Sequence, residues 1–165
     1  MAVFGYGRVS TTQQTTENQR LELEQAGHRL DYWHEDTGVS GSVPASQRPE
    51  FSRLLERIRP GETLVVAKLD RLGRDAIDVQ QTVRDLAGRG VRVVVHALGG
   101  ADLTAPAGKL MLAMLSAVAE MERDLLVERT QAGLARAKAE GKRLGRKPKT
   151  TDAQRVDILA RLEAG

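Results

Sequence analysis

Short apolar runs mark the expected strands in the first hundred residues. Residues 63–67 and 91–96 are dominated by Val and Leu and have the length of a strand. Residues 3–10 form a similar run that contains two glycines and ends in polar residues, and residues 30–35 form a shorter one. A run that is apolar throughout, as at residues 63–67, is typical of a strand buried on both faces of a parallel sheet.

Stretches with helical character separate these runs. Residues 13–26 and 75–87 are each followed by glycine, a common residue after the last turn of a helix. In the stretch that begins at Pro49, apolar residues at positions 51, 54, 55 and 58 have the spacing of a helix with one buried face. The alternation predicts an α/β fold with a mostly parallel central sheet flanked by helices. Ligands of such sheets bind beyond the carboxyl ends of the strands.

A much longer helix is expected to follow. After residue 106 the chain contains no proline up to residue 140, and a helix of that length extends about 50 Å. One domain of this size cannot cover its apolar stripe, so the spacing predicts a subunit interface that continues into a charged arm. The alternative is that the helix folds back as the last helix of the α/β layer. The stripe repeats at intervals of four and three residues and consists of Leu110, Met114, Val118, Met121 and Leu125.

Composition narrows the class of protein. The 165 residues include no cysteine, which excludes a disulfide scaffold, a thiolate zinc site and a cysteine nucleophile. Aromatic residues make up 3% of the chain, so its core must be aliphatic. No run of about 18 apolar residues and no basic-then-apolar start occurs, so we expect a cytoplasmic protein without a membrane partner.

The positive charge is concentrated near the C-terminus. Residues 136–149 carry seven cations against Glu140, a local net charge of +6 within a chain of net charge +3, so the remainder is acidic at −3. A concentrated basic segment on an acidic body predicts a polyanionic partner, and a solvated charged tail is the alternative. The cations are Arg136, Lys138, Lys142, Arg143, Arg146, Lys147 and Lys149.

The candidate chemistry lies where the strands end. Ser10 follows the first run, and four arginines fall in the predicted loops. Arginines that share a pocket repel each other unless an anion lies between them, and the guanidinium group matches a phosphodiester in geometry. The pattern predicts a phosphodiester site among these arginines, close to the serine that follows the first strand. The arginines are Arg8, Arg48, Arg71 and Arg74.

Each of these residues also has a structural interpretation. Ser10 could cap the following helix, and Asp70 with Arg71 could be an ordinary surface ion pair. Asp75 is expected to cap a helix. The three histidines are scattered, and no cluster has the spacing of a metal site.

Six short motifs together resemble the serine recombinases, the family of resolvases and DNA invertases. They are Tyr6-Gly7-Arg8-Val9-Ser10-Thr11, Gly38-Val39-Ser40-Gly41, Arg48-Pro49, Lys68-Leu69-Asp70-Arg71-Leu72-Gly73-Arg74, Ala119-Glu120-Met121-Glu122-Arg123 and Glu128-Arg129-Thr130. They occur in the family's order and cover nearly the whole chain.

The resemblance implies a site-specific recombinase that needs neither cofactor nor metal. Ser10 would attack a DNA phosphate, release a 3′-hydroxyl and hold the 5′ end as a phosphoserine until religation. The four loop arginines would bind and polarise the phosphate. Asp70 would orient arginines or assist proton movement, and the residues leave open whether an arginine or Asp70 takes the proton of Ser10. The supporting polar groups would be Lys68, Gln14 and Gln19, and the further DNA contacts Arg123 and Arg129.

The resemblance also implies the partners and the organisation of the chain. The partner would be double-stranded DNA at a crossover site, bound by a homodimer and brought into a homotetramer, with possible accessory DNA-bending proteins.

Residues 1–103 would form the catalytic core, 104–140 an oligomerisation and DNA-gripping helix, and 141–150 an arm for the minor groove. Residues 151–165 would be the first helix of an incomplete helix-turn-helix domain.

Two other functions remain open from the residues. One is a catalytically silent DNA-binding or architectural oligomer, in which substitution of Ser10 has no effect. The other is a metal-dependent nuclease that uses Asp70, Glu35 and Asp36, and a chelator would inhibit it. The motifs do not separate resolvase from invertase.

Overall fold

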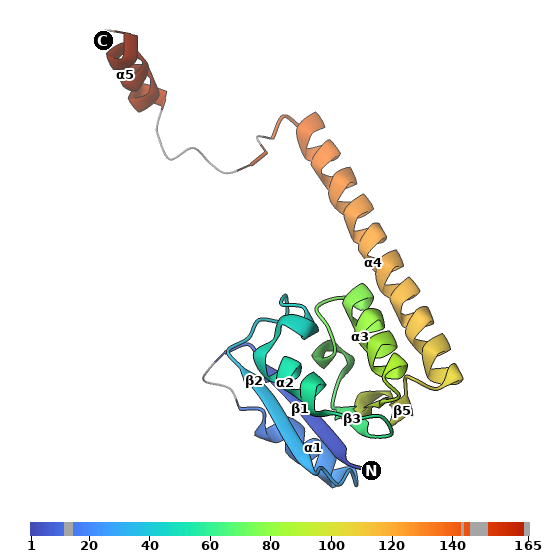
Figure 1. Ribbon diagram of the computed structural model, residues 1–165. Coiled ribbons are helices and arrows are strands. Elements are labelled where there is room, and N and C mark those ends of the chain that lie inside the picture. Colours follow the sequence, from blue (N-terminus) through green and yellow to red (C-terminus); the bar gives the residue numbers. More distant parts are fainter. Residues whose placement is uncertain (12–14, 143, 146–151, 164–165) are drawn as a thin grey trace. The chain divides into compact units, whose positions relative to one another are not determined.

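A five-stranded mixed sheet with helices on both faces forms the centre of the computed structural model (Figure 1). The structure describes residues 1–11, 15–142, 144–145 and 152–163. The strand order is β2-β1-β3-β4-β5, in which β5 alone pairs antiparallel to its neighbour. The predicted α/β fold with a mostly parallel sheet is confirmed. Strands and helices are β1 (Val3–Val9), α1 (Glu17–Gln25), β2 (Tyr32–Thr37), α2 (Pro49–Arg57), β3 (Thr63–Val66), α3 (Ala76–Gly88), β4 (Arg92–Val95), β5 (Ala101–Asp102), α4 (Pro106–Ala139) and α5 (Asp152–Glu163), with 3₁₀ turns at Ala45–Gln47, Leu69–Arg71 and His96–Leu98.

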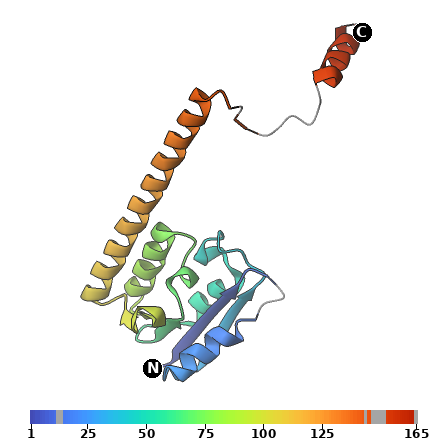
Figure 2. The same cartoon turned by 180° about the vertical axis from the view of Figure 1, so that it is seen from behind.

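Two hydrophobic clusters lie on the two faces of the sheet. The larger cluster contains Phe4 and Tyr6 of β1 together with Phe51 of α2 and Leu86 of α3. The smaller one is formed around Leu23 of α1. Helices α2 and α3 therefore cover one face and α1 the other, as the two opposite views show (Figures 1 and 2).

The topology brings three strand ends together. β1 lies between β2 and β3 and is parallel to both, so the loops that follow these strands emerge at one edge of the sheet. The chain proceeds from β1 to β2 in one direction and to β3 in the other, and such a reversal of strand order leaves a crevice at the carboxyl ends. Ser10, residues 38–44 and the loop at residues 67–75 all emerge at this edge.

Two predicted boundaries are wrong. The second strand begins at Tyr32 and runs to Thr37, later than residues 30–35, because its backbone pairs with β1 up to Val9 opposite Thr37. Helix α1 begins at Glu17, later than residue 13, and the carbonyl of Thr16 accepts the backbone N–H of Gln19. The boundary of β2 depends on a partner strand distant in the sequence, whereas the start of α1 is marked by a local contact.

The long helix is present and spans two compact units. The first unit, Met1–Met121, contains the sheet and the first turns of α4, whose Gly108, Leu112 and Ser116 are buried. A Cβ atom at Gly108 would overlap the carbonyl oxygen of Asp102, so only glycine allows this close approach. The first half of α4 thus packs as the last helix of the layer, the alternative that the sequence left open.

The second unit, residues 122–165, contains the rest of α4 and helix α5. The apolar residues of α5, Val156, Ile158, Leu159 and Leu162, are all exposed. Within the described part of the chain, no helix is both long and apolar enough to cross a membrane.

Candidate active site

Arg8 is a buried arginine near the end of β1, two residues before Ser10. It is 7% exposed, and its Nη1 donates to the carbonyl of Val39 at 2.7 Å. A Cβ atom at Gly41 would lie 3.0 Å from Nη2 of Arg8, so the loop after β2 is closely fitted to this guanidinium group. Burial, reinforced by the positive charges of Arg71 and Arg48, lowers the pKa of Arg8.

Arg48 lies at the start of α2 and is completely buried. Its Nε donates to the carbonyl of Val43 at 3.0 Å, and its Nη1 donates to the carbonyl of Arg71 at 2.6 Å. The side chain therefore ties the loop after β2 to the loop after β3.

Arg71 completes the cluster from the loop after β3. Its Nη1 donates to the carbonyl of Arg8 at 2.5 Å, and its Nη2 lies 3.3 Å from Oδ2 of Asp70. Three of the four predicted arginines are thus brought together by direct contacts between their side chains and backbones. We call Arg8, Arg48 and Arg71 the arginine cluster.

Each member of the arginine cluster keeps a buried N–H group without a partner among the described residues. These groups are Nε of Arg8, Nη2 of Arg48 and Nε of Arg71. A buried donor of a charged group is costly when unpaired, and buried polar groups nearly always have a partner. An anion among three guanidinium groups would satisfy the donors and offset the repulsion between the charges.

Ser10 is exposed directly after β1, two residues beyond Arg8. Gln19 of α1 fixes the backbone at this point because its amide accepts from the N–H of Arg8 at 3.4 Å and donates to the carbonyl at 3.1 Å. Gln14, the other predicted supporting glutamine, lies outside the described residues.

The remaining predicted groups lie on the loop after β3 and are more exposed. Lys68 is exposed at its start, and the Asp70 side chain is 57% exposed beside Arg71. The Arg74 side chain is half exposed, and its Nε lies 3.1 Å from Oδ2 of Asp75. Asp75 caps α3 as expected, with its carboxylate accepting the N–H of Asp78.

A cavity of about 310 Å³ borders this loop. It is lined by Leu69, Asp70, Gly73, Arg74, Asp75, Ala76, Val79, Leu112, Leu115, Ser116 and Ala119. Most of these side chains are apolar, so the cavity is a poor place for a phosphate, and the arginine cluster is the better one.

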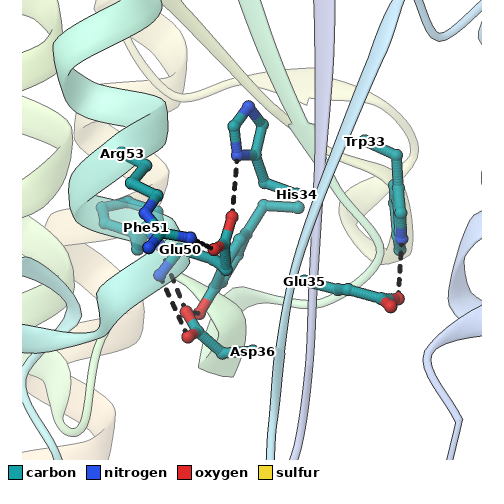
Figure 3. A network of polar contacts seen from close by, with 8 residues as sticks. Trp33, His34, Glu35, Asp36, Glu50, Phe51 and Arg53 are labelled. Atoms are coloured by element: carbon teal, nitrogen blue, oxygen red, sulfur yellow. Dashed lines mark hydrogen bonds and ion pairs between the residues drawn. The ribbon is translucent and has the colours of Figure 1, made fainter.

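A buried pair behind the arginine cluster was not identified from the sequence as part of the site. The hydroxyl of Tyr6 donates to Oδ2 of Asp36 at 3.0 Å. The Asp36 carboxylate also accepts the N–H groups of Glu50 and Phe51 at the start of α2, directly after Arg48 (Figure 3). Burial, followed by the Asp36 charge, raises the pKa of Tyr6. The sequence offered Asp36 only as a residue of a metal-dependent nuclease, and the contacts across the sheet give it a structural role beside Tyr6 instead.

The carboxylates that a metal-dependent nuclease would use do not converge. Glu35 lies on the opposite side of β2 from Asp36, and it accepts hydrogen bonds from the Thr16 hydroxyl and from the Trp33 indole (Figure 3). These hydrogen bonds lower the pKa of Glu35. Among the described residues, no three His, Asp or Glu side chains are grouped as a metal site requires.

The predicted DNA contacts that the structure describes belong to the second unit. Arg123, Arg129, Arg136 and Lys138 are exposed on α4. Lys142 is exposed after the helix and pairs with Glu140 at 2.6 Å. Arg143, Arg146, Lys147 and Lys149 lie outside the described residues.

Comparisons with known proteins agree with the motifs. The family described as the N-terminal domain of resolvases matches residues 3–143. The chain is 54% identical over 168 residues to the transposon Tn2501 resolvase of Escherichia coli, covering 99% of this chain and 84% of that protein. It is 40% identical over 163 residues to the DNA-invertase hin of Salmonella typhimurium, with 98% and 82% covered.

A solved structure extends the comparison to the fold. The crystal structure of the N-terminal catalytic domain of TP901-1 integrase is 31% identical in sequence to this chain. The match covers 76% of this chain and 98% of the integrase chain, with a TM-score of 0.58. The resemblance inferred from the six motifs is therefore confirmed. The chain belongs to the resolvase and DNA invertase family of serine-type site-specific recombinases.

Proposed function

We propose that Ser10 is the nucleophile of this recombinase and that the arginine cluster binds the scissile phosphate. The Oγ atom of Ser10 forms a bond to phosphorus and loses its proton, while the bond from phosphorus to the 3′ oxygen breaks and that oxygen gains a proton. The product is a 5′-phosphoserine and a free 3′-hydroxyl. Because one ester replaces another, the reverse reaction rejoins the DNA without an energy source.

The observation that carries this proposal is the set of three guanidinium N–H groups of the arginine cluster that have no partner among the described residues, with Arg8 two residues before Ser10. Each group is buried, and each belongs to a side chain that also donates from Nη1 to a backbone carbonyl. Such donors are fixed in direction before a ligand arrives. Fixed donors stabilise the charge that grows on the phosphate oxygens in the transition state.

The other predicted residues support this arrangement. Gln19 fixes the backbone on which Arg8 and Ser10 lie, and Asp70 orients Arg71. Arg74 and Lys68, both exposed at the carboxyl edge of β3, contact the DNA phosphates. Gln14 would assist from the segment that precedes α1.

We further propose that α4 carries the subunit contacts and leads into the DNA-binding segments. The stripe from Leu110 to Leu125 is exposed, which is the state expected of an interface that lacks its partner. A homodimer would bind each crossover site, and two dimers would form a tetramer. Residues 141–150 would follow the minor groove, and residues 151–165 would belong to a helix-turn-helix domain.

A targeted cleavage assay tests the nucleophile. The full chain is joined at its C-terminus to a metal-free DNA-binding domain of known site, and it is mixed with DNA that carries paired sites at several spacings. We expect a covalent adduct at the 5′ ends that is absent in Ser10→Ala and persists in chelator. Denaturing gels and intact-mass analysis measure it. Circular dichroism should show the fold of Ser10→Ala unchanged because Ser10 is exposed.

Three outcomes would contradict the proposal. An adduct that persists in Ser10→Ala would assign the nucleophile to another residue. Tight binding by the wild-type protein without an adduct at any spacing would favour a silent architectural role for this chain. Cleavage that depends on a divalent metal would instead favour a nuclease mechanism.

A further inference from the structure

The carboxylate of Asp78, in the first turn of α3, connects two loops that are far apart in sequence. Its Oδ2 atom accepts the backbone N–H of Arg74 at 2.9 Å. The same atom accepts the backbone N–H of Ala45, 33 residues away, at 3.1 Å. One oxygen thus holds the segment before Arg48 against the loop that contains Arg71 and Arg74.

Helix capping does not account for these contacts. Asp75 is the N-cap of α3, and its own carboxylate accepts the N–H of Asp78 at 2.9 Å. In a capping box the third helical residue would return a hydrogen bond to the N–H of the cap residue itself. Asp78 instead bonds the residue before the cap and a residue of a different loop. The first turn therefore keeps its cap when the side chain of Asp78 is removed.

The two segments that Asp78 joins are the segments that hold Arg48. The Arg48 guanidinium group donates to the carbonyl of Val43, two residues before Ala45, and to the carbonyl of Arg71, three residues before Arg74. The 3₁₀ turn Ala45–Gln47 then leads directly into Arg48, whose N–H donates to the carbonyl of Ala45 at 3.1 Å. The Asp78 carboxylate and the Arg48 guanidinium group thus fix the spacing of the same two loops at different points.

We propose that Asp78 is a positioning residue for the phosphate site, which acts by setting the distance between these two loops. This inference rests on the proposed role of the arginine cluster. Arg48 comes from one loop and Arg71 from the other, so a change in spacing moves their unpaired N–H groups relative to each other. The role of Asp78 is geometric, because an oxygen that accepts two N–H groups is sufficient for it. An amide oxygen in the same place meets this requirement without a charge.

The test uses the full chain in the cleavage assay described above. The rate of adduct formation at saturating DNA is measured separately from DNA affinity, for Asp78→Ala and Asp78→Asn. We expect Asp78→Ala to lower the rate on the order of a hundredfold, because a displacement of about 1 Å in a reacting site has effects of that size. DNA affinity should stay within about threefold, because most contacts to DNA are made to other phosphates. Asp78→Asn should keep the rate within about fivefold of the wild type.

Two control variants on the same helix separate positioning from stability. Val83→Ala removes buried apolar contacts of α3 and lowers stability without removing a hydrogen bond between the loops. Asp85→Ala removes an exposed carboxylate whose hydrogen-bond donor, among the described residues, is Gln81 of the same helix. Both should keep the rate near that of the wild type when all variants are assayed well below their melting temperatures.

The inference is overturned if Asp78→Ala cleaves at the wild-type rate, if Asp78→Asn loses as much as Asp78→Ala, or if Val83→Ala loses as much as Asp78→Ala. A failure of the proposed function is distinguishable from these results. It would appear as a missing adduct in the wild-type protein, or as an adduct that persists in Ser10→Ala.

Discussion

A fully buried arginine such as Arg48 has five N–H donors to satisfy, and its position is defined by how the protein satisfies them. Two carbonyls, those of Val43 and Arg71, take two of its N–H groups and fix the plane of the guanidinium group. Arg8 and Arg71 also donate to backbone carbonyls, and Arg71 in addition pairs with the exposed carboxylate of Asp70. Because carbonyls carry no net negative charge, the cluster keeps its positive charge for a phosphate.

Replacing Arg48 by lysine tests whether the site needs the planar guanidinium group or only its positive charge. A lysine keeps the charge but presents a compact ammonium group, which cannot bridge two carbonyls and still direct a fixed donor at the phosphate. We expect Arg48→Lys to lower the rate of adduct formation on the order of a hundredfold. Stability should fall by about 1–3 kcal/mol in urea unfolding because buried carbonyls lose their donors.

The matched control for this variant is Arg53→Lys on the same helix. Arg53 is exposed and pairs with Glu50, so its stability change should stay within about 0.5 kcal/mol and its cleavage rate should not change. Equal losses in the two variants would show that burial of the guanidinium group is unimportant.

The stabilisation that Asp75 gives to α3 depends on pH, and the pKa of Asp75 sets the direction of this dependence. The N–H of Asp78, with smaller contributions from Arg74, lowers the pKa of Asp75. When the pKa of a carboxyl group is lower in the folded protein, its ionised form stabilises the fold. This stabilisation is fully present above the pKa of the unfolded chain, about 3.9 for Asp, and is lost as the pH falls through the pKa of the folded protein. Asp75→Ala should therefore lower the free energy of unfolding by about 1 kcal/mol at pH 7. Urea unfolding from pH 7 to pH 3 should show the difference between the two proteins shrink, and a difference that grows towards pH 3 would contradict it.

At the scale of elements, the loop after β3 and helix α3 act as one unit. Gly73 packs so tightly on α3 that a Cβ atom there would lie 2.6 Å from the backbone nitrogen of Val79. The Asp78 carboxylate also accepts the N–H of Arg74, and the Asp75 carboxylate accepts the N–H of Asp78. Hydrogen bonds of the first helical turn thus hold the same loop. The position of Arg74 and of the neighbouring Arg71 is thus set by the packing of this loop against α3.

Gly73→Ala should displace this loop. The obstacle is backbone rather than a mobile side chain, so we expect a loss of about 1–3 kcal/mol in stability and a strong loss of adduct formation. Gly133→Ala on α4 is the control because a Cβ atom there would meet no atom of another element within 4 Å, and a helical Gly→Ala change should raise helix stability by about 0.5–1 kcal/mol. Thermal unfolding and the cleavage assay measure both variants. A fully active Gly73→Ala protein would show that the loop is adaptable.

At the scale of the whole molecule, helix α4 leaves a row of apolar side chains exposed. Met114 and Val118 are 62% and 49% exposed on α4, and neighbouring apolar residues along the helix are exposed as well. Exposed apolar area of this extent is uncommon on a protein that acts as a monomer. It agrees with the subunit contact that we propose for α4.

Two charges on this stripe should weaken self-association. The double variant Met114→Glu/Val118→Glu replaces two apolar side chains that the proposed interface would bury. Each buried side chain of this kind contributes about 1.5–3 kcal/mol, so the dissociation constant should rise at least about tenfold. Sedimentation velocity over a range of concentrations measures it. Gln131→Glu, which adds a charge at an exposed polar position of the same helix, is the control and should not change assembly. Unchanged assembly of the double variant would place the subunit contact elsewhere.

The pattern of residues was enough to predict the alternation of strands and helices up to β4, the long helix and the chemistry available at the strand ends. Apolar periodicity reports local burial, so residues 63–67 and the helix that starts at Pro49 were predicted closely. Ser10 and the arginines could be assigned to one site because the carboxyl ends of parallel strands meet at one edge. The family motifs gave the same residues, and the cap at Asp75 followed from its position before a helix.

Only the tertiary structure decided which arginines converge and what holds them. Arg8, Arg48 and Arg71 lie together with carbonyl partners, whereas Arg74 is half exposed beside Asp75. The roles of Asp36 and Asp78, the short strand β5 and the start of β2 also became visible only there. In each case the deciding partner is distant in the chain, as Ala45 is from Asp78. Periodicity and capping patterns record neighbours a few residues away, whereas hydrogen bonds between loops depend on how the sheet brings those loops together.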